Sequence, residues 1–399
     1  MTAGERRASV SLAAIFALRM LGLFLVLPVF ALEAARLPGG DDPARVGLAL
    51  GIYGLTQALL QIPLGMASDR WGRKRVIQAG LLLFALGSLL AAWAPTLEWL
   101  TLGRALQGAG AISAAVTALL ADLTRDAVRT KAMALIGISI ALTFALSLAV
   151  APLLVAAIGL SGLFVLTAVL TLLGMALVAW VVPAEPLRLQ APRRGGLAAV
   201  LRHGSLLRLN LGVFVLHAVQ LAMWVAVPAL LLQAGLAAER HGIVYLLAVL
   251  VAFAVMGALL FRLERRGYLR GVFLCAIGLI ALAQLGLGWA SASAATPHPA
   301  GLAVLGLLLF VFFLGFNTLE ASQPSLVSRL ATSDTRGAAL GVYNTLQSLG
   351  FFVGGAAGGW LLAHWGPSAL FLGCAALTLL WLALAWSLPP QPASGSVRR

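Results

Sequence analysis

The most informative stretch of this chain is Gly65-Met-Ala-Ser-Asp69-Arg70-Trp-Gly72-Arg73-Lys74-Arg75. It joins two long apolar segments, and its four basic residues are typical of a loop at the cytoplasmic face of a membrane. Gly65 and Gly72 permit a close helix approach and a tight turn. Asp69 stands at a helix end, where its charge favours the positive N-terminus of a neighbouring helix. An ordinary basic loop would explain the basic residues but not the spacing of the glycines and the aspartate.

The composition around this stretch is that of a membrane protein. Of 399 residues, 61% are hydrophobic and 10% are charged, and the mean hydropathy is +1.00. A soluble domain carries roughly a quarter of its residues as charged side chains. Apolar runs of roughly 18 or more residues recur from end to end, and each can cross a hydrocarbon core of about 30 Å. The sequence therefore predicts an all-α membrane protein.

The net charge of +14 resides in short loops between the apolar runs. A basic patch on a soluble face would indicate nucleic acid, but this distribution fits the positive-inside rule, so we expect no nucleic-acid partner. Cys275 and Cys374 both lie inside apolar runs and indicate neither a disulfide framework nor a metal site. There is no Walker loop, metal-ligand cluster or nucleophile triad. We therefore expect no cofactor, no metal and no enzymatic activity.

Twelve transmembrane helices are predicted. The first, after Arg6 and Arg7, is longer than a typical signal-peptide core, so it is interpreted as an uncleaved helix. A basic segment rich in proline and glycine separates six spans from six. We expect an N-terminal six-helix bundle at 1–183, a cytoplasmic linker at 184–206 and a C-terminal six-helix bundle with a short tail at 207–399. The expected spans are 10–35, 44–67, 75–95, 98–123, 130–157, 160–183, 207–234, 241–261, 269–291, 299–328, 336–364 and 367–388.

The basic residues also predict the orientation, because they recur after every second span. An odd number of spans would break this alternation. Both termini and the central linker are therefore expected in the cytoplasm, with the chain in a bacterial inner membrane. The residues on this side are Arg6, Arg7, Arg70, Arg73, Lys74, Arg75, Arg125, Arg129, Lys131, those of the linker, Arg262, Arg265, Arg266, Arg270, Arg329, Arg336, Arg398 and Arg399.

The stretch from Gly65 to Arg75 resembles the signature that the major facilitator superfamily carries between its second and third helices. A second signature, in the fourth helix, is matched by Leu102-Gly103-Arg104-Ala-Leu-Gln107-Gly108-Ala-Gly110. Further matches run from Arg19 to Pro28, Gly51 to Pro63, Asp122 to Arg125 and Gly341 to Trp360. Together they resemble the drug:proton antiporter branch with twelve helices, and specifically YajR-type transporters. The resemblance implies two pseudo-symmetric six-helix bundles with the substrate path at their interface.

The chain departs from this pattern in two places. YajR-type proteins carry a soluble domain after the last helix, and the residues after 388 are expected to leave no room for one. The antiporter signature in the fifth helix contains Gly-Pro flanked by glycines, whereas this chain has Ala149-Val-Ala151-Pro152. The direction of transport, antiport or symport, therefore stays open.

Residues of the first stretch are expected to act together with Asp122 at the cytoplasmic ends of spans two and four. Asp69, Arg73 and Asp122 form one expected charge relay. The resemblance implies that this cluster latches the outward-open state, with Asp69 acting on the N-terminus of span eleven near Thr335 and Arg336. The alternative is a solvated surface cluster worth under about 1 kcal/mol. The complete candidate latch is Gly65, Asp69, Arg70, Gly72, Arg73, Lys74 and Asp122.

Ionisable residues inside the apolar spans are costly in lipid and are candidates for proton coupling. They are Arg19, Arg104, His217 and Glu320. A lone buried carboxyl at Glu320 would favour its protonated form and carry a proton through the transport cycle. A partner such as Arg19 would instead make Glu320 half of a structural ion pair. His217 is a second candidate for carrying the proton, because histidine is the side chain that most often changes charge near neutral pH. A histidine satisfied by helix packing is the alternative.

Polar residues at helical spacing form stripes on two spans, Tyr53, Gln57 and Gln61 on one and Tyr343, Asn344 and Gln347 on the other. Together with Asn317 they are candidates for lining a central cavity, and interhelical hydrogen bonding is the alternative. Glycines on span eleven are expected to permit tight packing against span two, namely Gly350, Gly354, Gly355, Gly358 and Gly359.

The function expected is secondary transport of a small molecule by alternating access, driven by protons, in a monomer embedded in the lipid bilayer. The resemblance implies efflux of lipophilic or amphipathic compounds. A cavity of aromatics and amides with one carboxylate favours hydrophobic or cationic substrates, whereas a second inward Arg or Lys would argue for anions. A metabolite uptake symporter is the alternative within transport. A membrane sensor or a multi-pass membrane enzyme would need a signalling domain or a catalytic loop.

Overall fold

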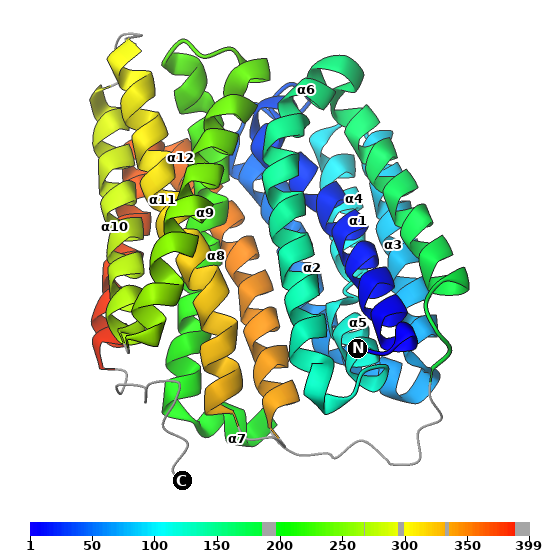
Figure 1. Ribbon diagram of the computed structural model, residues 1–399. Helices are drawn as coiled ribbons and strands as arrows, with labels where there is room; N and C mark the ends of the chain where they lie inside the picture. The colour runs from blue at the N-terminus through cyan, green and yellow to red at the C-terminus, as the bar shows by residue number, and fades with distance from the viewer. Residues whose placement is uncertain (186–196, 267, 294–298, 332–334, 388–399) are drawn as a thin grey trace.

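The computed structural model describes residues 1–185, 197–266, 268–293, 299–331 and 335–387. The regular structure of these residues is entirely helical, as Figure 1 shows. A chain in hydrocarbon must satisfy its backbone polar groups within each segment, and only helices and closed barrels do so. The all-α prediction is therefore confirmed.

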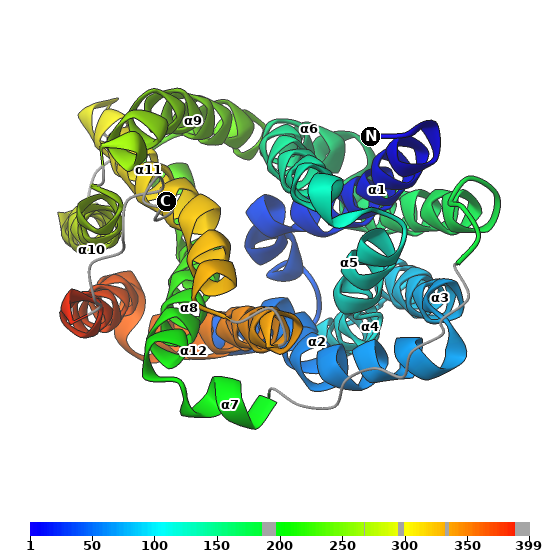
Figure 2. The same ribbon diagram turned by 60° about the horizontal axis from the view of Figure 1, so that its bottom comes forward.

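The first half of the chain forms α1 to α6, which lie together on one side of the molecule (Figures 1 and 2). Local signals set the helix starts: Thr2 and Glu5 form a capping box at α1, and Asp42 caps α2 with Pro43 in its first turn. The bounds are α1 Ala3–Ala34, α2 Pro43–Trp71, α3 Arg73–Ala92, α4 Leu97–Ala109, α5 Ser113–Asp122 and α6 Asp126–Trp180.

The second half forms the other side of the molecule (Figure 2). It begins with a short helix, α7, that precedes the first long one. The bounds are α7 Leu197–Arg202, α8 Gly204–Gln233, the 3-10 turn η1 Ala238–Arg240, α9 His241–Arg265, α10 Leu269–Ser293, α11 Pro299–Leu330 and α12 Arg336–Trp386. The exact boundaries predicted for the two bundles and the linker stay a prediction.

Two helices are long enough to cross a membrane twice. α6 has 55 residues and α12 has 51, and at 1.5 Å per residue each would extend for roughly 80 Å if straight. Gly159 (φ 68°) interrupts the helical geometry of α6 and Gly366 (φ 77°) that of α12. Figure 1 shows α6 turning back on itself at one end of the molecule. Among the described residues, ten helices can span a membrane, and counting the halves of α6 and α12 separately gives the twelve predicted spans.

The predicted span 98–123 is not one continuous helix. α4 ends at Ala109 and α5 begins at Ser113, and the residues between them are not helical. Gly110 lies against the carbonyl oxygen of Gly80, which leaves no room for a side chain at the break. The expectation of a single helix is therefore wrong at this point, because close packing against α3 requires the chain to deviate.

One end of the molecule carries the basic residues and is called the basic end. Arg7 donates to the carbonyl oxygen of Val181 (2.9 Å) and Lys74 Nζ to that of Val182 (3.0 Å). In the second half, Arg208 and Arg270 donate to the carbonyl oxygens of Ser387 and Trp386 (3.0 and 2.6 Å). Basic residues from separate loops thus meet helix ends at the same side, as their alternation predicts. The placement of this end in the cytoplasm stays a prediction.

The two halves approach each other closely in the part of the molecule away from the basic end. A Cβ added at Gly47 of α2 would lie 2.7 Å from Gly359 Cα, and one at Gly51 would lie 2.7 Å from the oxygen of Phe352. A Cβ added at Gly242 of α9 would lie 2.7 Å from the oxygen of Ala149 in α6. Backbone therefore packs on backbone across the interface, which only glycine permits.

The glycines of α12 face two neighbours rather than one. Gly355 and Gly359 pack against α2, as expected. Gly350, Gly354 and Gly358 instead pack against α8, where a Cβ at Gly354 would lie 2.8 Å from Ala218 Cα. The expectation that all five serve the contact with α2 is wrong, because their spacing places them on two faces of one helix. α12 thus packs between α2 of the first half and α8 of its own half.

Candidate functional site

Three residues of the candidate latch, Asp69, Arg73 and Asp122, meet at the basic end. Arg73 Nη2 lies 2.6 Å from Asp69 Oδ1, and Arg73 Nε lies 3.4 Å from Asp122 Oδ2. Arg73 also donates to the hydroxyl of Ser68. The Arg73 side chain is 11% exposed, against 25% and 30% for the two carboxylates. A single guanidinium thus bridges α2 and the end of α5, as the charge-relay prediction requires.

The turn between α2 and α3 is completed by a residue that the sequence analysis missed. Gly72 has φ 97° and gives α3 no side-chain cap. The carboxylate of Glu185 accepts hydrogen bonds from the backbone N–H groups of Arg73 (2.9 Å) and Lys74. A carboxylate at a helix N-terminus satisfies unpaired donors and the helix dipole together. The available signal was a lone acid directly after the sixth span, in a segment that is otherwise basic.

The remaining latch candidates take different positions. Gly65 faces Ala114 of α5, where an added Cβ would lie 3.4 Å from the alanine Cβ, and Arg70 is exposed. Thr335 is the residue that precedes α12. The side chain of Arg336 lies outside the described residues, so the predicted action of Asp69 on that helix end stays a prediction.

A second ion pair secures the start of α1. Glu5 accepts from Arg125 Nε (2.7 Å) and Nη2 (3.1 Å), and its carboxylate also belongs to the capping box with Thr2. The hydrogen bond and the attraction of the carboxylate raise the pKa of the Arg125 guanidinium. Arg125 follows Asp122 in one of the matched motifs. The pair thus ties the first helix to the loop that follows Asp122 of the latch.

Glu320 does not pair with Arg19, the structural partner considered from the sequence. Its Oε2 lies 3.4 Å from Nε2 of His217, which is also 2.7 Å from Nε2 of Gln347. The His217 side chain is 2% exposed and that of Glu320 is 40% exposed. Phe316 and Phe351 pack edge-on against the imidazole ring. The His217–Glu320–Gln347 cluster therefore joins α8, α11 and α12.

The hydrogen bonds define how this cluster holds a proton. His217 Nδ1 lies 2.9 Å from the carbonyl oxygen of Val213, which can only accept, so Nδ1 carries the hydrogen. In the neutral ring Nε2 is then an acceptor and takes a hydrogen bond from the Gln347 amide. A protonated Nε2 would donate to Glu320 Oε2 instead, with the amide turned to present its oxygen. A proton on His217 or Glu320 therefore changes contacts on three helices.

Arg19 and Arg104 lie in the first half, around Tyr53. Arg19 Nη2 donates to the Tyr53 hydroxyl (2.8 Å), and the Arg104 guanidinium lies over the Tyr53 ring at 5.1 Å. Both side chains are buried, and Arg104 donates to Gln107 (2.9 Å). Arg19 and Glu320 do not form an ion pair, because Arg19 bonds residues of the first half whereas Glu320 lies beside His217 in the second half.

The predicted cavity-lining amides are mostly unpaired. The side-chain atoms of Gln61 have no hydrogen-bond partner, nor do Gln57 Oε1 and Asn317 Nδ2. Tyr343 donates to Gln323 Oε1 at 3.5 Å, while Asn344 and Gln347 are half-buried. Hydrogen bonding between helices, the alternative role, accounts for Tyr53, Tyr343 and Gln347 but not for these orphan amides.

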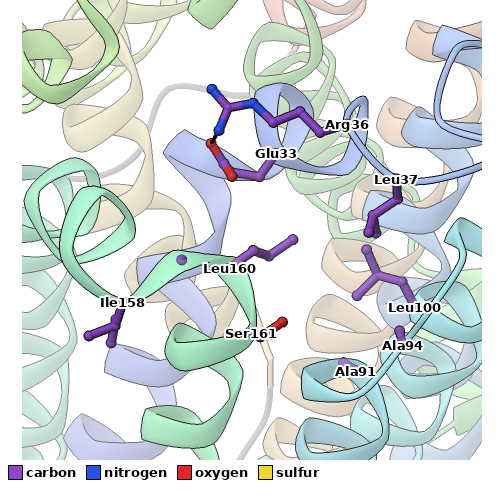
Figure 3. A pocket seen from close by; sticks show the side chains of 10 residues that line it. Glu33, Arg36, Leu37, Ala91, Ala94, Leu100, Ile158, Leu160 and Ser161 are labelled. Atoms are coloured by element: carbon purple, nitrogen blue, oxygen red, sulfur yellow. Dashed lines mark ion pairs between the residues drawn. The ribbon is translucent and has the colours of Figure 1, made fainter.

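Two cavities lie away from the basic end. One of about 320 Å³ sits within the first half, where the Glu33–Arg36 ion pair (2.9 Å) faces Ile158, Leu160 and Ser161 across it (Figure 3). The other, of about 260 Å³, lies between the halves and is lined by Pro152, Glu239 and His241 among others. None of the predicted cavity-lining residues borders either cavity, so their role stays a prediction. Pro152 of the altered antiporter motif does border the second.

Comparison with known proteins agrees with this architecture. The chain is 42% identical over 402 residues to the inner membrane transport protein YajR of Escherichia coli (strain K12), which covers 100% of this chain and 87% of that protein. It is 28% identical over 358 residues to the multidrug resistance protein MdtH of Aeromonas hydrophila, covering 85% and 84% of the two chains.

A solved structure shares the fold at low sequence identity. A mutant form of the nucleoside transporter NupG superposes with a TM-score of 0.76 at 15% identity, over 95% of this chain and 99% of that one. A sequence profile described as Major Facilitator Superfamily matches residues 12–354 and 263–399. The resemblance seen in the motifs is confirmed, and the fold is that of transporters rather than enzymes. The chain belongs to the Major Facilitator Superfamily.

Proposed function

We propose that this chain is a proton-coupled secondary transporter that exports small lipophilic or amphipathic molecules across the inner membrane in exchange for protons. Membership in a superfamily of transporters supports the general activity. One relative is named an inner membrane transport protein and another a multidrug resistance protein, which supports the membrane and the direction. Its partners are the substrate, protons and the lipid bilayer, and it works as a monomer with both termini in the cytoplasm.

The observation that carries the proton-coupling proposal is the His217–Glu320–Gln347 cluster. Without the extra proton, the Glu320 carboxylate lies 3.4 Å from Nε2 of the neutral His217 ring. With the proton on His217, its Nε2–H can donate to that carboxylate. The two protonation states therefore favour different arrangements of α8, α11 and α12. α8 and α12 also pack on each other through Gly350, Gly354 and Gly358. Proton binding can thus act on the helices that form the interface between the halves.

The conformation of the chain supports alternating access. The halves are joined away from the basic end by the glycine contacts of α2 with α12 and of α9 with α6. With the basic end in the cytoplasm, this arrangement is closed toward the outside. The Asp69–Arg73–Asp122 relay stands at the other end, where the halves must meet in the opposite state. We therefore propose that the relay stabilises the outward-open state, as the resemblance implies.

The proposal is tested with the purified chain in proteoliposomes that contain a pH-sensitive dye. Lipophilic and amphipathic compounds are added under an imposed pH gradient. Antiport predicts that a transported compound moves protons in the opposite direction to itself. Proton movement in the same direction would favour the uptake symporter, and failure of every compound to alter proton flux would overturn proton coupling for that panel.

A further inference from the structure

The fourth span is the only one of the first six predicted spans in which the described chain loses helical structure away from the ends of the span. Residues 110–112 are non-helical, and α5 restarts at Ser113 with no side chain capping its first turn. Its ten residues therefore present unpaired backbone N–H groups and a positive helix end within the membrane. Broken helices of this kind direct their N-termini at anionic groups in transporters.

Arg19 lies at this break. Its Nη1 is 3.4 Å from Ser113 Oγ, and its Nη2 is 3.3 Å from the carbonyl oxygen of Gly110. The side chain is 1% exposed, and its Nε has no hydrogen-bond partner. A buried guanidinium with an unused donor therefore stands at the N-terminus of α5.

The charge at this place is not balanced by an acidic side chain of the described residues. All partners of Arg19 are neutral, and Arg104 beside it bonds only Gln107 and the carbonyl oxygen of Leu50. No acidic side chain of the described residues forms an ion pair with either arginine. Two buried cations and a helix N-terminus are costly unless an anion accompanies them.

From this arrangement we infer that the transported molecule carries an acidic group, such as a carboxylate, which binds Arg19 between α1, α2 and the N-terminus of α5. This rests on the proposed transport function and specifies its substrate class. Ser113 and Gln57 are half-buried, so the site borders a less enclosed surface. From the sequence we expected hydrophobic or cationic substrates, because anionic substrates would need a second inward Arg or Lys. The structure brings two buried arginines, Arg19 and Arg104, together around Tyr53.

The test uses benzoate as the probe and benzamide, of the same shape without the charge, as its control. The melting temperature of the full chain in detergent and chloride-free buffer is measured against probe concentration. Benzoate is expected to stabilise the wild type at concentrations at least about tenfold lower than benzamide, since a charge-assisted hydrogen bond is worth about that factor. Equal effects of the two compounds would overturn the inference. So would equal stabilisation by chloride, because the site would then hold an inorganic counter-ion only.

Substitutions of Arg19 and Ser113 test where benzoate binds. Arg19→Gln should weaken benzoate binding at least about tenfold, whereas Arg6→Gln, at an exposed position on the same helix, should leave it unchanged. Ser113→Asp would place a carboxylate beside Arg19, so it should raise the melting temperature and abolish the benzoate effect. Ser113→Asn is the neutral control and should still bind. Benzoate binding that survives in Ser113→Asp would overturn the inference even if Arg19→Gln does not fold.

These binding measurements are independent of proton coupling. Loss of proton flux with intact benzoate binding would contradict the proposed function alone. Proton-coupled transport of neutral or cationic compounds, with no preference for benzoate over benzamide, would contradict the anion site alone.

Discussion

Replacing Gly355 by alanine should drive the two halves apart at the end away from the basic residues. The added Cβ would lie 2.8 Å from the Cα and the N of Gly51, and both are backbone atoms that cannot rotate away. Overpacking of this kind costs about 1–3 kcal/mol. The cost falls only on the conformation in which α2 and α12 touch. The equilibrium should therefore shift toward the opposite conformation by a factor of roughly 5 to 150.

The shift is measured as the alkylation rate of one cysteine at the interface. Ala149→Cys, opposite Gly242, is introduced after Cys275 and Cys374 are replaced by serine. Gly355→Ala should raise its alkylation rate at least about fivefold. Gly341→Ala on the same helix is the matched control, because its added Cβ would meet nothing within 4 Å. An unchanged rate in Gly355→Ala, or an equal increase in Gly341→Ala, would refute the reasoning.

Asp69→Asn should cut transport while preserving membrane insertion, because the amide cannot form the 2.6 Å ion pair with Arg73; wild-type transport would show that the relay is no latch. Glu185→Gln should destabilise the protein by about 1 kcal/mol through the N-terminus of α3, so an unchanged melting temperature would argue against the cap. Tyr245→Phe should stabilise the protein by about 1–3 kcal/mol, because the Tyr245 hydroxyl is buried without a hydrogen-bond partner. Tyr53→Phe should instead destabilise the protein, because it removes the hydrogen bond from Arg19. The same sign of melting-temperature change in both tyrosine variants would contradict this.

The helices could be predicted because hydropathy and glycine are local signals. The predicted gaps between spans, at 157–160 and 364–367, fall on Gly159 and Gly366, where the backbone is not helical. The predicted first span, 10–35, missed the start of α1 at Ala3, although the capping box of Thr2 and Glu5 is a local signal. The break at 110–112 could not be predicted from local signals, because its cause is the approach of Gly80 from another helix.

The candidate site was predictable only where a motif or a lone charge marked it. The motif residues Asp69 and Arg73 and the lone acid Glu320 were identified in this way. Partners distant in sequence were missed: Glu185 is 112 residues from Arg73, and Glu5 is 120 residues from Arg125. The suggested pairing of Arg19 with Glu320 failed for the same reason. Which buried charge meets which depends on helix packing that no local pattern records.

The proton-coupling claim is tested most directly by comparing two modes of transport in proteoliposomes for one transported compound. Glu320→Gln is expected to retain exchange of labelled for unlabelled compound, which needs no net proton movement, while losing accumulation driven by a pH gradient. Wild-type protein should perform both. Gradient-driven accumulation by Glu320→Gln at the wild-type rate, with the wild-type dependence on pH, would contradict the assignment of the proton to the His217–Glu320–Gln347 cluster.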